Sequence, residues 1–310
     1  MRDSDSGWSD YWEKDGAQGE VFVNSEGGKH PTLADYWRKQ LESLEQGSRI
    51  IDVASGAGSV FGHLPEGHDH QLFAVDISGA ALKLLTKRFP NVTTIVGSAD
   101  RAPFCDGSFD VVVSQFGAEY AGINAFAEAA RLISNDGQLI ALCHIRNGYI
   151  DSGNRAQLSE AKLVAELGFI DKAVKLVTAA FASDALALKR AEDDFVPAAE
   201  KVCGGMERCK KGIHTYLFFG FRELFEKRQQ YDLSDISGWL EDMHSELEMN
   251  IDRLSRMCLA SLSDHDVAEI HKIFEAQGLV DVNCTPFEIP GNELPVAWSL
   301  TARRRRNDND

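Results

Sequence analysis

The sequence predicts an α/β fold, with a mainly parallel sheet covered by helices on both faces and interrupted by a long helical insertion. Between residues 49 and 145, short apolar runs alternate with segments of helical periodicity, the order in which helices connect parallel strands. From 151 to 260 the pattern is helical, with few strand-like alternations. Strand-like runs resume at 280–287 and 296–301, which places the last strands of the sheet after the insertion.

The N-terminal segment, residues 1–30, is polar with isolated aromatic residues. It forms either a flexible tail or a flap whose aromatic side chains close over the active site. Apolar residues spaced by three to four positions then predict a helix over 32–44. The aromatic residues are Trp8, Tyr11, Trp12 and Phe22.

The first strand and the turn after it organise the rest of the chain. Residues 50–53 form an apolar run, followed by small residues that include Gly56 and Gly58. Glycine has no Cβ, so a ligand can approach the main chain closely there. Asp76 ends the next apolar run, 72–75. It lies about 20 residues past the glycines, where nucleotide-binding α/β folds place a carboxylate on ribose hydroxyls.

Asp52 distinguishes between two cofactor classes that share this layout. A dinucleotide places its pyrophosphate at the glycine turn, and the Asp52 carboxylate at the end of the strand would repel it. S-adenosyl-L-methionine has no phosphate and carries a sulfonium and an ammonium group, which nearby acidic residues favour. The residues therefore favour S-adenosyl-L-methionine as the cofactor.

A second motif follows the third strand, where residues 97–110 read GSADRAPFCDGSFD. Together with the glycine turn, this stretch resembles the class I S-adenosylmethionine-dependent methyltransferases. It is most similar to the small-molecule branch that includes ubiquinone and menaquinone methylases, and the resemblance covers residues 49–145 and the end of the chain. It implies a Rossmann-like, seven-stranded, mainly parallel sheet with an antiparallel C-terminal hairpin at its edge.

The resemblance also implies which residues bind the cofactor. The Asp52 carboxylate and the glycine turn would hold the methionine end, and Asp76 would hold the ribose. The family uses an acid and a small residue at the adenine, where this chain has Ser98 and Ala99, and Asp100 could partly replace the acid. The expected set is Asp52, Ala54, Gly56, Gly58, Asp76, Ile77, Ser98, Ala99, Gln115 and Phe116.

Periodicity and turn residues place the other elements of the core. The helix that follows the glycine turn is short, because Pro65 and Gly67 stop it. Ser78 caps the next helix. The expected elements are helices over 59–64, 78–88 and 123–132, strands over 92–96, 111–114 and 138–143, and a turn at Asn135-Asp136-Gly137.

Candidate catalytic residues follow the fourth and fifth strands. In an open α/β sheet, ligands lie beyond the carboxyl ends of the strands, so residues 115–120 and His144 should flank the transferred methyl group. A base is needed only if the attacking atom carries a proton. His144 is the first candidate, since an imidazole titrates near neutrality, and Glu119 and Tyr120 are the alternatives. The competing interpretation is that His144 only shapes the strand end.

The helical segment 151–260 is predicted to be a cap over the acceptor, as the resemblance implies for an insertion after strand five. A helical pack that buries only itself, or a dimer contact, is the alternative. Breaks are expected at Gly204-Gly205 and at 232–237. Candidate wall residues of the acceptor pocket are Phe218, Phe219 and Phe221.

The end of the chain returns to the core. Ser263 caps a helix that stops at Gly278, and the two last strands follow. Arg303–Arg306 form a basic run that is predicted to be a solvated terminus. The expected divisions are therefore 1–30 as tail or flap, 31–150 and 261–303 as core, 151–260 as cap and 304–310 as tail.

Composition limits the partners. The chain of 310 residues has 32 basic and 48 acidic residues, a net charge of −16, which would repel a nucleic-acid backbone. Its six cysteines form no CxxC pair, no metal-ligand spacing is evident, and the polar N-terminus does not resemble a secretory signal. No apolar run approaches the roughly 20 residues of a membrane span. These features predict a cytoplasmic protein, with oligomerisation left open.

The sequence therefore predicts methyl transfer from S-adenosyl-L-methionine to a small organic acceptor. The first alternative is a tRNA or protein methyltransferase built on the same core. The second is a catalytically silent protein that binds the cofactor as a scaffold or sensor. The sequence motifs of adenine, glutamine-amide and cytosine methylases are absent, which favours the small-molecule acceptor.

Overall fold

The computed structural model describes residue 12 and residues 30–182 and 184–305. By its internal contacts the chain forms two compact units, one made of the residues up to Ile150 and from Ala260 onward, the other of 151–259. Trp8, Tyr11 and Phe22 of the predicted tail or flap, and most of the predicted C-terminal tail, lie outside the described residues. No helix among the described residues is long and apolar enough to cross a membrane.

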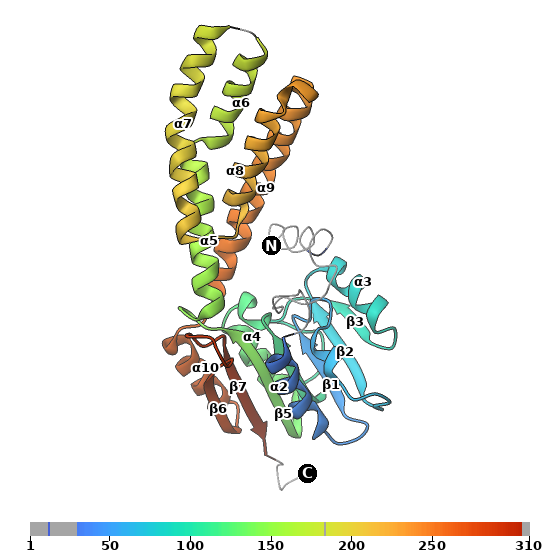
Figure 1. Ribbon diagram of the computed structural model, residues 1–310. Helices are drawn as coiled ribbons and strands as arrows, with labels where there is room; N and C mark the ends of the chain where they lie inside the picture. The colour runs from blue at the N-terminus through green and yellow to red at the C-terminus, as the bar shows by residue number, and fades with distance from the viewer. Residues whose placement is uncertain (1–11, 13–29, 183, 306–310) are drawn as a thin grey trace. The chain divides into compact units, whose positions relative to one another are not determined.

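The first unit contains a seven-stranded sheet with the strand order β3-β2-β1-β4-β5-β7-β6 (Figure 1). Strands β1 to β5 run parallel, whereas β7 is antiparallel to both β5 and β6. This is the predicted fold class, including the antiparallel hairpin at the C-terminal edge. The strands are β1 (Arg49–Val53), β2 (Gln71–Asp76), β3 (Thr93–Val96), β4 (Phe109–Gln115), β5 (Ile133–His144), β6 (Leu279–Phe287) and β7 (Ala297–Arg304).

Helices cover both faces of this sheet. On one face, α4 (Asn124–Leu132) and α10 (Asp264–Ala276) bury Phe126 and Phe274. On the other face, Trp37, Phe61 and Leu85 are buried by three further helical elements. These are α2 (Pro31–Glu42), the 3-10 helix η2 (Val60–His63) and α3 (Gly79–Arg88). The sheet is thus enclosed, and its loops at the strand ends are left to form a site.

Two predicted caps are confirmed. Ser78 Oγ accepts a hydrogen bond from Ala81 N at the start of α3. Ser263 begins α10 with a capping box, because Asp266 N donates to Ser263 Oγ and Ser263 N donates to the Asp266 carboxylate. Burial of one face of each helix and satisfaction of its first N–H groups explain why these segments are helical.

The predicted turn at Asn135-Asp136-Gly137 is wrong as a boundary, because β5 already begins at Ile133. The register on β4 moves from Phe109 opposite Ile133 to Val111 opposite Gln138, so the predicted turn residues form an irregularity inside the strand. Asp136 has a positive φ of 64°. Ser134 Oγ donates to Asp110 Oδ1 at 2.9 Å, which fastens this segment to β4 and extends the strand.

The second unit consists of helices and buries its own apolar core, which includes Phe169, Leu217, Phe221 and Leu240. A 3-10 helix, η4 (Arg228–Gln230), precedes its last helix. The long helices are α5 (Tyr149–Glu166), α6 (Phe169–Phe181), α7 (Ala185–Arg208), α8 (Ile213–Glu226) and α9 (Leu233–Ala260).

The predicted break at Gly204-Gly205 is wrong, since α7 runs on to Arg208. Gly205 faces Glu160 of α5, and a Cβ on Gly205 would collide with that carboxylate. Glu160 in turn accepts two hydrogen bonds from Arg208, at 2.8 and 3.0 Å. The glycine therefore allows close packing of two helices. The second predicted break, at 232–237, is shorter than expected, because α9 already starts at Leu233.

Candidate functional site

The carboxyl ends of β1, β2, β4 and β5 lie at one edge of the sheet, because these strands are parallel. The ends of β1 and β4, and the loops after them, contact each other there. Ser114 Oγ donates to the Val53 carbonyl at 2.8 Å, and a Cβ on Gly117 would lie only 2.9 Å from Ala54 Cβ. Most of the residues predicted to bind ligands are therefore gathered at this edge.

Asp76, at the end of β2, holds the glycine turn in place. Its Oδ2 accepts a hydrogen bond from Gly56 N and its Oδ1 accepts one from Ser78 N, both at 2.8 Å. Gly56 has a positive φ of 51°, and a Cβ there would collide with the ring of Trp12. Gly58 has a φ of 76°. The turn thus needs glycine both for its backbone conformation and for its close contacts.

Asp52, at the end of β1, is 1% exposed. Its Oδ1 has no hydrogen-bond partner within the described part of the chain. Burial, and then the negative charge of Asp76, raise the pKa of the Asp52 carboxyl well above its usual value. An uncompensated buried carboxyl of this kind is a favourable place for a ligand cation.

We expect Asp52→Asn to stabilise the ligand-free protein, and to do so increasingly as the pH rises. Because the folded-state pKa is raised, the folded protein binds the Asp52 proton more tightly than the unfolded chain, so stability falls as pH rises from the unfolded to the folded pKa. A tenfold difference in proton affinity between the two states corresponds to about 1.4 kcal/mol of stability, and a kcal/mol moves the melting temperature by roughly 2–4 °C.

Thermal unfolding from about pH 5 to pH 8, a span around neutrality, measures this difference. The control is Glu293→Gln, which removes an exposed carboxylate from the loop before β7. Equal pH dependence of the melting temperature in wild type and Asp52→Asn would contradict the assignment of a raised pKa to Asp52.

Gln115, the last residue of β4, and Phe116, the first residue of the loop after it, are both constrained. The Gln115 side chain accepts a hydrogen bond from Trp37 Nε1 and donates one to Ser59 Oγ at 3.3 Å. Phe116 has a positive φ of 53° and Ala54, in the adjacent loop, has one of 54°. Non-glycine residues rarely adopt this conformation, and it concentrates at functional sites.

The residues predicted at the adenine are less enclosed. Ile77 and Ser98 are half-buried and Asp100 is exposed, whereas Ala99 is buried. Ile77 directly follows β2, and Ser98 and Ala99 follow β3, the strand paired with it. They therefore lie on the neighbouring strand ends beside Asp76.

Glu119, in the 3-10 helix η3 (Ala118–Ala121) that follows β4, and His144, the last residue of β5, form a buried pair. Glu119 Oε1 lies 2.7 Å from His144 Nδ1 and also accepts the His144 backbone N–H at 2.8 Å. The two side chains are 0% and 1% exposed. His144 Nε2 has no hydrogen-bond partner among the described residues. A buried polar atom left without a partner is costly, which makes a functional role the better explanation.

Aromatic rings surround this imidazole. The ring centres of Phe116 and His144 are 4.7 Å apart, and Tyr120 meets His144 edge-on at 5.8 Å. Burial, and then neighbouring Glu119, raise the pKa of the Cys143 thiol well above its usual value, so this thiol is held protonated. The structure brings the three sequence candidates, His144, Glu119 and Tyr120, together around one ring.

Sequence patterns missed Trp37 and Ser59 at this edge, whereas Trp12 is one of the aromatic residues named in the predicted tail or flap. Trp37 and Ser59 hold Gln115, and the Trp12 ring, which is 8% exposed, packs on the glycine turn together with Ala57 and Ala81. Trp37 belongs to the apolar stripe of a helix, so its N–H contact had no sequence signal. Among the described residues, no cluster of three or more His, Cys, Asp or Glu side chains could hold a metal ion.

Residues 51–141 match a family model described as a methyltransferase domain. An uncharacterized methyltransferase of Schizosaccharomyces pombe is 28% identical over 149 residues, covering 47% of this chain and 59% of that protein. A demethylmenaquinone methyltransferase of Chlorobaculum tepidum is 34% identical over 93 residues, which cover 27% of this chain and 38% of that protein. A ubiquinone/menaquinone biosynthesis C-methyltransferase of Rickettsia felis is 32% identical over 157 residues, which cover 43% of this chain and 62% of that protein.

The chain thus spans less than two thirds of the length of each of these relatives. Among solved structures, it is similar to a geranyl diphosphate C-methyltransferase of Streptomyces coelicolor, with 13% identity, 46% of this chain and 64% of that chain covered, and a TM-score of 0.38. A structural similarity at this level carries no functional information.

The matched range begins in β1 and ends in β5, so it contains the glycine turn, the acidic residues that end β1 and β2, and the loop after β4. The strand order with its antiparallel C-terminal hairpin agrees with this match. Residues 51–141 are therefore a methyltransferase domain that is similar to the class I S-adenosylmethionine-dependent methyltransferases.

Proposed function

We propose that this protein transfers a methyl group from S-adenosyl-L-methionine to a small organic acceptor that carries a phenol-like hydroxyl group. The observation that supports this most is the buried His144–Glu119 pair, with its unpartnered Nε2 atom. Methyl transfer that needs only alignment of two reactants requires no such base. An acceptor that must lose a proton requires a base, and the His144–Glu119 pair can supply one.

The residues at the strand ends fit the cofactor in charge and in shape. When bound, S-adenosyl-L-methionine would supply a methyl group that is activated by its positively charged sulfur. Asp52 offers a buried carboxyl to a cation, and Gly56 allows close approach to the main chain. In this proposal Asp76 holds the ribose. The adenine is bordered by Ile77, Ser98 and Ala99. The rest of the cofactor site consists of Ala54, Gly58, Gln115 and Phe116.

His144 acts as the base, and Glu119 is its positioning residue. With the proton on Nδ1, the ring donates to Glu119 Oε1, and Nε2 then carries the lone pair that accepts the hydroxyl proton. Glu119 also stabilises the positive ring that results. A phenol, with a pKa near 10, gives up its proton to an imidazole more readily than an aliphatic alcohol does.

Loss of this proton activates both the oxygen and the ring carbons beside it. Curated relatives are named for methylation at carbon, so the attacking atom is an outcome to be measured. The helical unit, residues 151–259, serves in this proposal as a cap over the acceptor, and Trp12 belongs to a flap over the cofactor. The net charge of −16 disfavours a nucleic-acid acceptor.

Two measurements on the full chain test the proposal. Calorimetry should detect binding of S-adenosylhomocysteine and none of NAD at equal concentration. Methyl-labelled S-adenosylmethionine and a panel of simple phenols and hydroquinones should then give a labelled product, whereas matching phenyl ethers without a free hydroxyl should not. Preference for NAD would overturn the cofactor. Methyl transfer to the ethers at the same rate would overturn the hydroxyl acceptor while leaving the cofactor assignment intact.

A further inference from the structure

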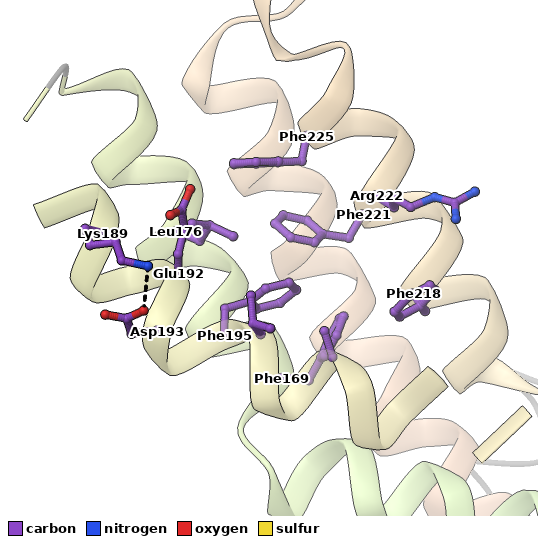
Figure 2. A pocket seen from close by; sticks show the side chains of 12 residues that line it. Phe169, Leu176, Lys189, Glu192, Asp193, Phe195, Phe218, Phe221, Arg222 and Phe225 are labelled. Carbon is purple, nitrogen blue, oxygen red and sulfur yellow. Dashed lines mark ion pairs between the residues drawn. The ribbon is translucent and has the colours of Figure 1, made fainter. Parts of the chain in front are cut away.

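A pocket of about 430 Å³ lies inside the helical unit, lined by residues of α6, α7 and α8 (Figure 2). This volume is within the range of roughly 300–1,000 Å³ that small-molecule sites occupy. Two of the phenylalanines predicted to form a wall, Phe218 and Phe221, line it. The third, Phe219, is 44% exposed and does not. None of the lining residues takes part in the methyl transfer proposed above.

The pocket has a largely aromatic wall. The Phe195 ring centre lies 5.1 Å from that of Phe169 and 5.2 Å from that of Phe221, and Phe225 lies 5.8 Å from Phe221. Phe169 and Phe221 are 0% and 2% exposed, so they form a fixed floor. Figure 2 shows these rings, from α6, α7 and α8, around one space. Tilted and edge-on rings of this kind offer faces and edges to another ring.

The two lining cations, Lys189 and Arg222, each lie beside an acidic residue. Lys189 Nζ pairs with Asp193 at 2.9 Å. The Arg222 guanidinium lies 3.8 Å from Glu226 and 4.9 Å from the centre of the Phe219 ring, and it extends away from the pocket in Figure 2. Glu192 adds a further carboxylate to the lining. An anion would find both lining cations already paired and would meet this additional negative charge.

We propose that this pocket binds an uncharged aromatic small molecule. The fixed aromatic floor supplies apolar area and ring contacts, which favour an aromatic ligand over a polar one. Both lining cations already lie beside acidic residues and Glu192 adds a negative charge, so the pocket favours a neutral ligand over an anion. The residues that line this pocket differ from those proposed to bind the cofactor or to accept the proton.

A matched pair of dyes tests both the site and the charge. N-phenyl-1-naphthylamine is neutral, and 1-anilinonaphthalene-8-sulfonate is the same skeleton with a sulfonate. Fluorescence titration of the full chain should show saturable binding of the neutral dye with one molecule per chain, and at least about tenfold weaker binding of the sulfonate, because a charge is costly to desolvate. Equal binding of both dyes would overturn the proposed ligand class.

Ala199→Leu places a larger side chain on the pocket wall and should weaken binding of the neutral dye by about tenfold or more, since filled space excludes the ligand. Val196→Lys, at a lining position that is 47% exposed, should weaken it without disturbing the fold. The control is Leu186→Ala, which changes an exposed apolar residue of α7 outside the pocket. Melting temperatures confirm folding of each variant.

Unchanged affinity for the neutral dye in folded Ala199→Leu and Val196→Lys would overturn the site. The competing occupant is a second copy of the chain, and sedimentation velocity with and without dye separates the two. Loss of dye binding in step with dimer formation as the protein concentration rises would assign this aromatic surface to self-association and overturn the ligand proposal.

Discussion

His144→Gln should lower kcat for a hydroxyl acceptor by about 100-fold or more, because a base in this position is typically worth 100- to 10,000-fold. The buried imidazole has an unpartnered Nε2, which is the proton acceptor in the proposed reaction. Glutamine has similar polarity but cannot take up the proton. Turnover and the melting temperature of the variant and the wild type, measured under the same conditions, separate loss of the base from loss of folding.

Glu119→Gln distinguishes positioning from packing. The amide keeps the shape of the side chain and an oxygen acceptor for His144, but it removes the negative charge. A hydrogen bond to a charged group is worth about 1.5–3 kcal/mol, or roughly 10- to 150-fold in kcat, with KM little changed. S-adenosylhomocysteine affinity and the melting temperature serve as controls. Normal kcat in both folded variants would remove the pair from the mechanism.

Asp76→Ala should weaken S-adenosylhomocysteine binding by at least about tenfold, since a hydrogen-bonding charge is worth about 1.5–3 kcal/mol. The loss has two sources. Asp76 is the proposed partner of the ribose, and it also fixes Gly56 N and Ser78 N, so its removal loosens the turn that carries the cofactor. Isothermal calorimetry measures the affinity directly.

Asp76→Asn separates the two sources, because asparagine keeps one carbonyl acceptor for a backbone N–H but loses the charge. We expect its affinity to lie between those of wild type and Asp76→Ala. Asp106→Asn is a control on an exposed carboxylate that pairs with Arg131 and is not among the proposed cofactor-binding residues. Wild-type affinity in a folded Asp76→Ala protein would contradict the placement of the cofactor at this strand end.

Local signals in the sequence were sufficient for most of the core. Ser78 and Ser263 were predicted as caps because each precedes an apolar periodic segment, and both side chains accept a hydrogen bond from the first turn. The strands alternating with helices predicted the parallel part of the sheet, and the family resemblance supplied its antiparallel edge. Both predictions depend on interactions within short stretches or on a pattern shared by a family.

Local sequence patterns could not predict contacts between segments that are far apart in the chain. In the sequence Gly205 resembles a helix breaker, whereas it lies inside α7 because α5 packs against it through Glu160. The irregular start of β5 depends on Asp110 in another strand. At the site, the sequence placed His144 and Glu119 at neighbouring strand ends as alternative bases. Only the folded chain brings them within 2.7 Å and makes them one pair.

The contact between Gly117 and Ala54 limits how acceptor preference could be redesigned. The loop after β4 is an obvious place for substitutions that change the acceptor, but its backbone rests on the loop that would carry the cofactor, with no room for a Cβ at Gly117. Grafting a loop from a relative with any larger residue at that position would shift Ala54 and disturb cofactor binding as well. Libraries should therefore keep Gly117 and Glu119 fixed and vary the other positions of this loop.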